Sequence, residues 1–181
     1  ASTYGNCESV LGQCLTNKNT YKFITKIPPI NSDVINTQQI QTSVDSVQES
    51  MQLLNTKSLH CLLLHNAIDL LKPGGDKLFS KLHDLKDKGM ILKLGVSLYS
   101  NSPVIDLINN FDLDIVQVPF NIIDRTIITK GYLELFKQHD IEVQARSIFL
   151  QGLLLMNPKK RPTYFNKWST KLNLFFDLCH M

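Results

Sequence analysis

Short runs of branched apolar residues alternate with longer segments of helical period along most of this chain. Such alternation is typical of βα units, in which parallel strands form a sheet and the intervening helices cover it. Five apolar runs occur, at residues 23–25, 62–64, 92–96, 114–118 and 141–145. The pattern therefore predicts an α/β fold with five parallel strands.

The segments between these runs carry apolar residues at the spacing of one helix face, which we interpret as packing against the sheet. The four stripes are Ile40, Val44, Val47, Met51 and Leu54; Leu78, Leu82 and Leu85; Val104, Leu107, Ile108 and Phe111; and Tyr132, Leu133, Leu135 and Phe136. Gly89 is a predicted helix stop. Ser102 is a predicted N-cap, with Pro103 at the first helical position.

The spacing of the strands is close to that of a (β/α)8 barrel, in which about 250 residues are shared among eight units. Five to six βα units do not close a barrel of eight strands. Two interpretations follow from the count. The chain is either a smaller open α/β sheet or a (β/α)8 TIM barrel truncated at both ends.

Composition limits the classes of protein to which the chain can belong. Its 181 residues, 43% of them hydrophobic, match one globular domain, which we assign to residues 1–181. A formal net charge of +3 gives no reason to expect a nucleic-acid partner. No apolar run approaches the ~20 residues that span a bilayer, so we expect no membrane segment. The cysteines are scattered, which favours a reduced, cytoplasmic protein without a metal site.

Reactive side chains in a parallel barrel lie where strands end and their loops begin. The side chains at such positions are Tyr4 before the first helix, Lys26 after "FIT", His65 after "CLLL", Ser97 in "LGVS", Gln117 in "DIVQ", and Arg146 and Ser147 in "VQARS". Each alone has a plainer explanation, such as a turn residue, a solvated cation or a hydrogen-bonded structural histidine. Their order along the chain favours a shared site.

Together these motifs resemble the aldo-keto reductase family. The resemblance is carried by "ASTYGNCESVLG", "FITK", "LLLH", "LKDKGMILKLGVS", "DIVQVPFN" and "IEVQARSIFLQGLL", which follow the family order from residue 1 to about residue 155. The remaining tail has no matching motif. It is predicted to form a further helix or two, with Phe165, Trp168, Leu172 and Phe175 on a shared face.

The resemblance implies an NADPH-dependent carbonyl reductase that acts on a small carbonyl substrate through an Asp-Tyr-Lys-His tetrad. Tyr4 would be the proton donor, Lys26 its partner and His65 the residue that orients the carbonyl group. The chemistry agrees, because a phenol exchanges its proton near neutral pH more readily when a neighbouring cation stabilises its ionised form. The hydride belongs to the nicotinamide, and the protein supplies position and the proton.

The resemblance also implies a set of cofactor contacts. Ser97 and Gln117 would contact the nicotinamide carboxamide, and Ser147 and Gln151 would approach the pyrophosphate. Arg146 stands where many members have a stacking tyrosine, and its planar guanidinium can also lie against a ring. Leu98 departs from the family, since many relatives have asparagine there, so the carboxamide contact depends more heavily on Ser97 and Gln117.

The family's second strand ends Asp-Thr-Ala-x-x-Tyr-Gly, and residues 1–5 fit its last five positions. The tetrad aspartate would then lie two residues before Ala1, so we expect this chain to be the central part of a reductase and to have little activity alone. The substrate, the preference for NADPH over NADH and the oligomeric state stay open.

Two other classes of function stay open. One is a noncatalytic, nucleotide-binding barrel that serves as a subunit or sensor. The other is an isomerase or lyase that uses Lys26 as a Schiff-base amine.

Overall fold

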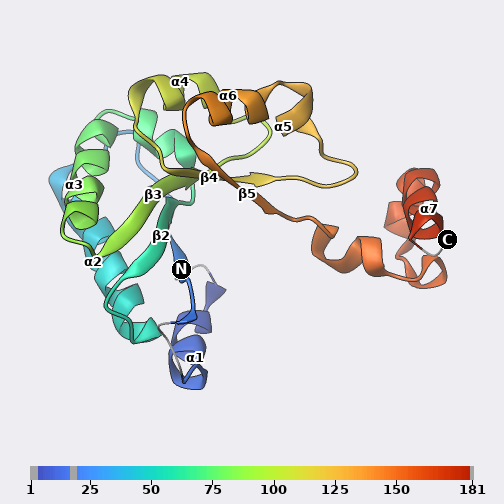
Figure 1. Cartoon of the computed structure of the whole chain (residues 1–181), viewed down its shortest axis with the longest axis horizontal. Helices are drawn as coiled ribbons and strands as arrows, with labels where there is room; N and C mark the ends of the chain where they lie inside the picture. The colour runs from blue at the N-terminus through green and yellow to red at the C-terminus, as the bar shows by residue number, and fades with distance from the viewer. Residues whose placement is uncertain (1–3, 17–19, 180–181) are drawn as a thin grey trace.

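The five predicted strands are all present and form one parallel sheet. The computed structural model describes residues 4–16 and 20–179, so Ala1, Ser2 and Thr3 of the first motif lie outside the described residues. The strands are β1 (Ile24–Ile27), β2 (Leu59–Leu64), β3 (Ile91–Ser97), β4 (Ile115–Pro119) and β5 (Glu142–Arg146). Their order in the sheet, β1-β2-β3-β4-β5, follows the order in the sequence (Figure 1). Each crossover therefore adds the next strand at the same edge, as in a barrel wall.

Helices follow the strands as the apolar stripes predict. They are α1 (Cys7–Cys14), α2 (Thr37–Leu54), α3 (Gly75–Asp87), α4 (Val104–Asn110), α5 (Thr126–Thr129) and α6 (Tyr132–Gln138), with a 3-10 turn, η3, at Ala67–Leu71. The long helix α2 starts with a capping box, in which the Asn36 side chain accepts from the Gln39 amide and the Gln39 side chain accepts from the Asn36 amide. These bonds satisfy amides that a helix start otherwise leaves unpaired.

The two faces of the sheet have different neighbours. Alternate strand residues, among them Leu62, Leu94 and Val116, belong to one large core that also contains the apolar faces of the helices. The residues between them point to the opposite face, where Cys61, Leu63 and Ile115 form a small separate cluster. That opposite face also carries polar and charged side chains toward its carboxyl edge, and it corresponds to the interior of a barrel.

Strands β3 and β4 approach each other closely at Gly95. A Cβ atom at this position would lie 1.8 Å from the carbonyl oxygen of Ile115, which no side chain tolerates without a shift of the backbone. Gly95 therefore lets the two strands pair in the register that places Ser97 beside Gln117.

The start of α4 differs from the prediction. Pro103 occupies the N-cap position, and no side chain caps the helix. The Ser102 hydroxyl instead accepts a hydrogen bond from the Tyr99 amide at 2.8 Å. Serine stabilises local turns as readily as helix starts, and here it closes the loop between β3 and α4.

The chain leaves β5 and continues into a projecting segment, which we call the arm (residues 150–178; Figure 1). It contains the 3-10 turns η4 (Leu150–Leu155), η5 (Pro158–Lys160) and η6 (Thr163–Trp168), followed by helix α7 (Ser169–Leu178). Leu153, Leu154 and Leu172 are buried there among Phe165, Trp168 and Phe175. The predicted shared face of the tail is therefore present, as the core of a small separate cluster.

Among the described residues, no helix combines the length and the apolar character that crossing a membrane requires.

Candidate active site

Helix α1 brings Tyr4 to the carboxyl end of β1. Glu8 of this helix is buried and accepts hydrogen bonds from the Thr25 hydroxyl at 2.5 Å and from the Ser50 hydroxyl at 3.1 Å. On the same helix, a Cβ atom at Gly12 would lie 1.9 Å from the carbonyl oxygen of Leu53, so α1 and α2 approach at backbone distance. One buried carboxylate and one glycine thus fix the helix that follows Tyr4.

Three predicted site residues, Tyr4, Lys26 and His65, lie together at this edge. Lys26 comes from β1, and His65 follows β2, where its amide donates to the Ile27 carbonyl at 3.1 Å. The Lys26 ammonium nitrogen lies 5.3 Å from the centre of the Tyr4 ring. The rings of Tyr4 and His65 are 6.3 Å apart, centre to centre. Tyr4 is 56% exposed, so its phenol is accessible to a ligand.

The surroundings of His65 favour its neutral form. Burial lowers its pKa from the usual 6.5, and the positive charges of Lys26 and Arg146 lower it further. Its Nδ1 atom is buried and has no hydrogen-bond partner within the described part of the chain. A neutral imidazole with an unused ring nitrogen can donate or accept one hydrogen bond to a ligand.

Ser97 and Gln117 lie side by side on the neighbouring strands. They are register partners of β3 and β4, and Ser97 is 1% exposed. The Gln117 side-chain nitrogen donates to the side-chain oxygen of Gln144 on β5 at 2.6 Å. Gln144 was not among the predicted residues, although its position, two residues before Arg146, places it on the same sheet face.

Arg146 at the end of β5 reaches across to the loop after β3. Its guanidinium donates to the Leu98 carbonyl at 3.1 Å and lies over the Tyr99 ring, 4.7 Å from its centre. The Nε atom is buried without a partner among the described residues. The guanidinium therefore does lie against a ring, but that ring is the protein's own Tyr99, a contact that the sequence analysis missed.

Ser147 and Gln151 form a second group, where β5 passes into the arm. Both have positive φ values, 57° and 56°, so the backbone turns sharply there. They line a groove of about 370 Å³ together with Phe165 and Trp168. The structure thus places Ser147 just before the arm and Gln151 within it, next to β5, whereas Tyr4 contacts Lys26 of β1, the strand at the other edge of the sheet.

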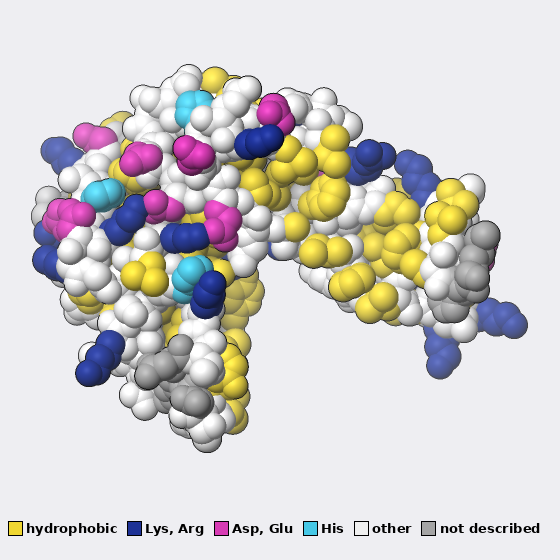
Figure 2. All heavy atoms as spheres, viewed as in Figure 1, with side chains coloured by type: hydrophobic (Ala, Val, Ile, Leu, Met, Phe, Trp, Pro, Cys, Tyr) yellow, Lys and Arg dark blue, Asp and Glu magenta, His cyan; other side chains and the backbone are white. Residues whose placement is uncertain are grey.

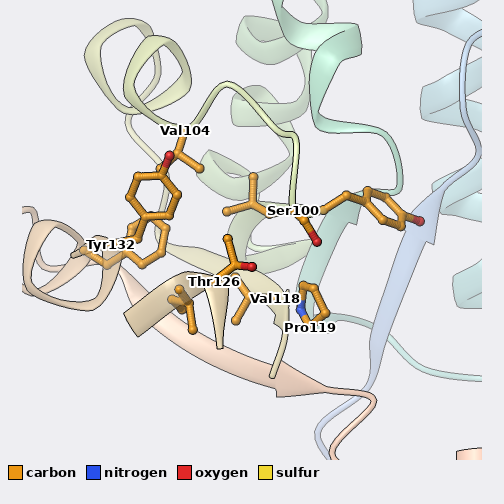
Figure 3. Close-up of a pocket in the computed structure, with 10 residues that line it drawn as sticks. Ser100, Val104, Val118, Pro119, Thr126 and Tyr132 are labelled. Atoms are coloured by element: carbon orange, nitrogen blue, oxygen red, sulfur yellow. The ribbon is translucent and has the colours of Figure 1, made fainter. Parts of the chain in front are cut away.

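A small cavity near this edge is distinct from the site. Figure 3 shows it between the helices and the strands, with Val104, Val118 and Tyr132 in its wall. Its volume is about 20 Å³, which is room for about one water molecule. Its walls belong to the helix side of the sheet, so we regard it as a packing gap.

No group of His, Cys, Asp or Glu side chains in the described ranges is arranged to hold a metal ion.

The parallel sheet of five strands and its helix-covered outer face match a truncated (β/α)8 barrel, and the candidate side chains lie at the carboxyl edge of its strands. The chain belongs to the aldo/keto reductase family, whose family model matches residues 1–180. A comparison with curated protein sequences returned no match.

Solved structures show the same fold. The glycerol dehydrogenase from Gluconobacter oxydans has a TM-score of 0.70 and 22% identity, over 96% of this chain and 59% of that one. The holo form of an aldo-keto reductase from Bacillus halodurans has a TM-score of 0.66 and 22% identity, over 86% of this chain and 49% of that one. An aldo/keto reductase from Klebsiella pneumoniae in complex with NADP and acetate has a TM-score of 0.64 and 20% identity, over 91% of this chain and 56% of that one. The chain therefore spans about half the length of these relatives.

Proposed function

We propose that this chain carries the proton-donating and carbonyl-orienting part of an NADPH-dependent reductase that converts an aldehyde or ketone to an alcohol. One observation carries the proposal: a phenol, an ammonium group and a neutral imidazole converge at the carboxyl end of β1 and β2. Membership of the aldo/keto reductase family supports it, as does the NADP bound to the relative from Klebsiella pneumoniae.

Each of the three side chains has a role in the proposed reaction. As the carbonyl carbon accepts a hydride, the electron pair of the C=O bond moves to oxygen, and Tyr4 donates its phenolic proton to that oxygen. The Lys26 ammonium group stabilises the phenolate that remains. His65 donates a hydrogen bond that orients the carbonyl oxygen.

The residues present fit a nicotinamide cofactor. Ser97 and Gln117 are the proposed contacts of the carboxamide, to which they offer a hydroxyl and an amide, and Ser147 and Gln151 are the proposed contacts of the pyrophosphate. Arg146 is the residue proposed to lie against a ring of the cofactor. Its Nε atom is buried and has no partner among the described residues, which agrees with a hydrogen-bond acceptor that the cofactor would supply. When bound, NADPH supplies the hydride.

We further propose that residues 1–181 belong to a single domain and that the protein works in the cytoplasm. The described cysteines, Cys7, Cys14, Cys61 and Cys179, are all free thiols, which agrees with a reducing compartment.

For this chain alone we expect slow turnover, because β1 and β5 each have only one neighbouring strand in the described sheet and present unpaired backbone groups.

The test is the oxidation of NADPH in the presence of a panel of aldehydes and ketones, for the chain and for Tyr4→Phe. Loss of the acid should lower kcat about 100-fold or more. Tyr21→Phe is the matched control, because Tyr21 is also exposed but lies outside the proposed site, and it should keep full activity. Equal rates for Tyr4→Phe and the unchanged chain would contradict the proposal. Cofactor binding with no turnover by a complete barrel that contains this chain would favour a noncatalytic nucleotide-binding protein instead.

A further inference from the structure

Asp69 and Lys72 form a buried ion pair that the proposed mechanism does not use. Asp69 belongs to η3, the turn that follows His65, and is 2% exposed. The Lys72 Nζ atom lies 2.7 Å from its carboxylate. The same carboxylate accepts hydrogen bonds from the Ile30 amide at 3.0 Å and from the Asn66 side-chain nitrogen at 2.9 Å. An ionised carboxylate only accepts, so the direction of each bond is fixed.

The pair holds one residue of the loop after β1 by both of its backbone groups. The Ile30 amide donates to Asp69, and the Ile30 carbonyl accepts from the Lys72 ammonium group at 2.6 Å. A buried ion pair adds little net stability, because the loss of hydration offsets the attraction between the charges. The contribution that remains is geometric, since the two bonds fix where Ile30 lies relative to η3.

The position of Ile30 is transmitted to Lys26 through a stiff segment. Residues 27–29 separate the two and include two consecutive prolines, whose rings fix the backbone angle φ. At the start of this segment, the Ile27 carbonyl accepts from the His65 amide at 3.1 Å. The chain after Lys26 is therefore attached at two points to the chain that begins at His65.

We propose that Asp69 and Lys72 are positioning residues for the reaction. By holding the Ile30 backbone, they keep the Lys26 ammonium group close to His65 and to the phenol beside it. The pair acts through the backbone and needs no contact with a substrate. This inference rests on the proposed function, because it assumes that Lys26 and His65 take part in the reaction.

The experiment measures the pKa of the His65 imidazole by NMR in the chain without cofactor, with His65→Gln to assign the signal. Burial and the positive charges of Lys26 and Arg146 lower this pKa from the usual 6.5, and the Tyr4 ring lies beside the imidazole. The pKa therefore reports how closely these groups enclose the ring. If the attachment of the loop is lost, the pKa should rise toward 6.5, because both causes weaken.

Two double variants separate the hydrogen bonds from the charges. Asp69→Ala with Lys72→Ala removes both bonds to Ile30, so the pKa of His65 should rise. Asp69→Asn with Lys72→Gln keeps an oxygen that can accept from the Ile30 amide and an NH₂ group that can donate to its carbonyl. This second variant should keep the pKa of the unchanged chain. Both variants lose one negative and one positive charge, so they do not differ in net charge.

An exposed ion pair with the same sequence separation provides the control. Lys81→Ala with Asp84→Ala removes a pair on the surface of α3 and should leave the pKa of His65 unchanged. If either double variant at the buried pair does not fold, Ile30→Pro and Ile30→Val replace the two. Proline removes the N–H that donates to Asp69, and valine keeps it. An unchanged pKa in the alanine or proline variant, or an equal rise in both members of a comparison, overturns the inference.

A second measurement is the NADPH oxidation assay. The kcat should fall about tenfold or more in Asp69→Ala with Lys72→Ala and recover in Asp69→Asn with Lys72→Gln. The KM for NADPH should not change, because the proposed cofactor contacts lie on other strands. If a complete barrel that contains this chain reduces no carbonyl, the proposed function fails, and with it the role in the reaction. The NMR titration then still shows whether the pair holds Lys26 close to His65.

Discussion

The sheet with its helices and the arm are built from similar proportions of apolar residues but bury them differently. In the body of the molecule (β1–β5 with α1–α6), one core joins side chains far apart in the sequence, from Phe23 to Ile141. In the arm, only Leu153, Leu154 and Leu172 are buried, and their neighbours are mostly other arm residues. Figure 2 shows apolar side chains that gather on the surface of the arm.

The comparison shows that apolar content alone does not stabilise a region. A core that ties distant segments together unfolds only as a whole, whereas a cluster made from nearby residues can open by itself. We therefore expect the arm to open at a lower free energy than the body, and the following predictions test that difference.

The largest effect is expected for Leu94→Ala in β3. Leu94 is fully buried in the main core, so its loss should lower the free energy of unfolding of the whole body by about 3 kcal/mol, through lost burial and the cavity that remains. Urea unfolding followed by far-UV circular dichroism measures it. Leu92→Ala is the control, because Leu92 is 55% exposed on the same strand and should cost little. Equal losses for the two variants would show that the body has no common core.

Leu172→Ala should destabilise the arm alone. The side chain is as deeply buried as Leu94, but its partners belong to the small cluster, so we expect a loss of about 2 kcal/mol in the opening free energy of the arm. Trp168 is the single tryptophan of the chain and lies in this cluster, so its fluorescence reports on the arm. The urea midpoint seen by circular dichroism should hardly move. A parallel shift of both signals would mean that arm and body unfold together.

Asn36→Ala should lower the free energy of unfolding of the body by about 1 kcal/mol, because it removes the side chain that caps the start of α2. Helix α7 in the arm has Trp168 at its N-cap position and no side-chain cap, so it offers no corresponding test. Thermal unfolding of Asn36→Ala and Asn36→Ser tests the cap, and serine, which also caps, should restore most of the stability. No change in the alanine variant would show that the capping box contributes nothing.

The smallest effect concerns pH and the body alone. The pKa of His65 is lowered in the folded chain, so the unfolded chain takes up a proton first as the pH falls. His65 therefore contributes stability above its ordinary pKa of 6.5, and this contribution is lost as the pH falls from that value through the folded pKa. Between pH 7.5 and 5.5, urea unfolding of the unchanged chain should lose more stability than that of His65→Gln. The Trp168 fluorescence transition of the arm should respond equally in both proteins.

The strands could be predicted because they contain short apolar runs, and the main helices because their apolar residues repeat at a period of 3.6. The start of α4 could not, since a serine before a proline suits both a cap and a turn, and only the position of the Tyr99 amide decides between them. The short helix α5 was missed for a related reason, because a segment of four residues, Thr126–Thr129, has too few positions to show a period.

Part of the candidate site could also be predicted. The ends of consecutive parallel strands lie side by side, which is why Lys26 and His65 fall near each other, and the turn before α1 adds Tyr4. The sequence gives no sign of where a long side chain points. The contact of Arg146 with Tyr99 depends on the distance across β4, and the bond between Gln117 and Gln144 on the register of two strands.

Glu8 has a consequence for which mutations the site can accept. Its carboxylate accepts from Thr25, the immediate neighbour of Lys26, while its helix begins just after Tyr4. A change at Thr25 or Glu8 therefore disturbs the phenol and the ammonium group at the same time, although neither mutated residue touches a substrate. Variation in this part of the protein should be tolerated in pairs that preserve the buried bond, and single replacements there should be as damaging as replacements of Tyr4 or Lys26 themselves.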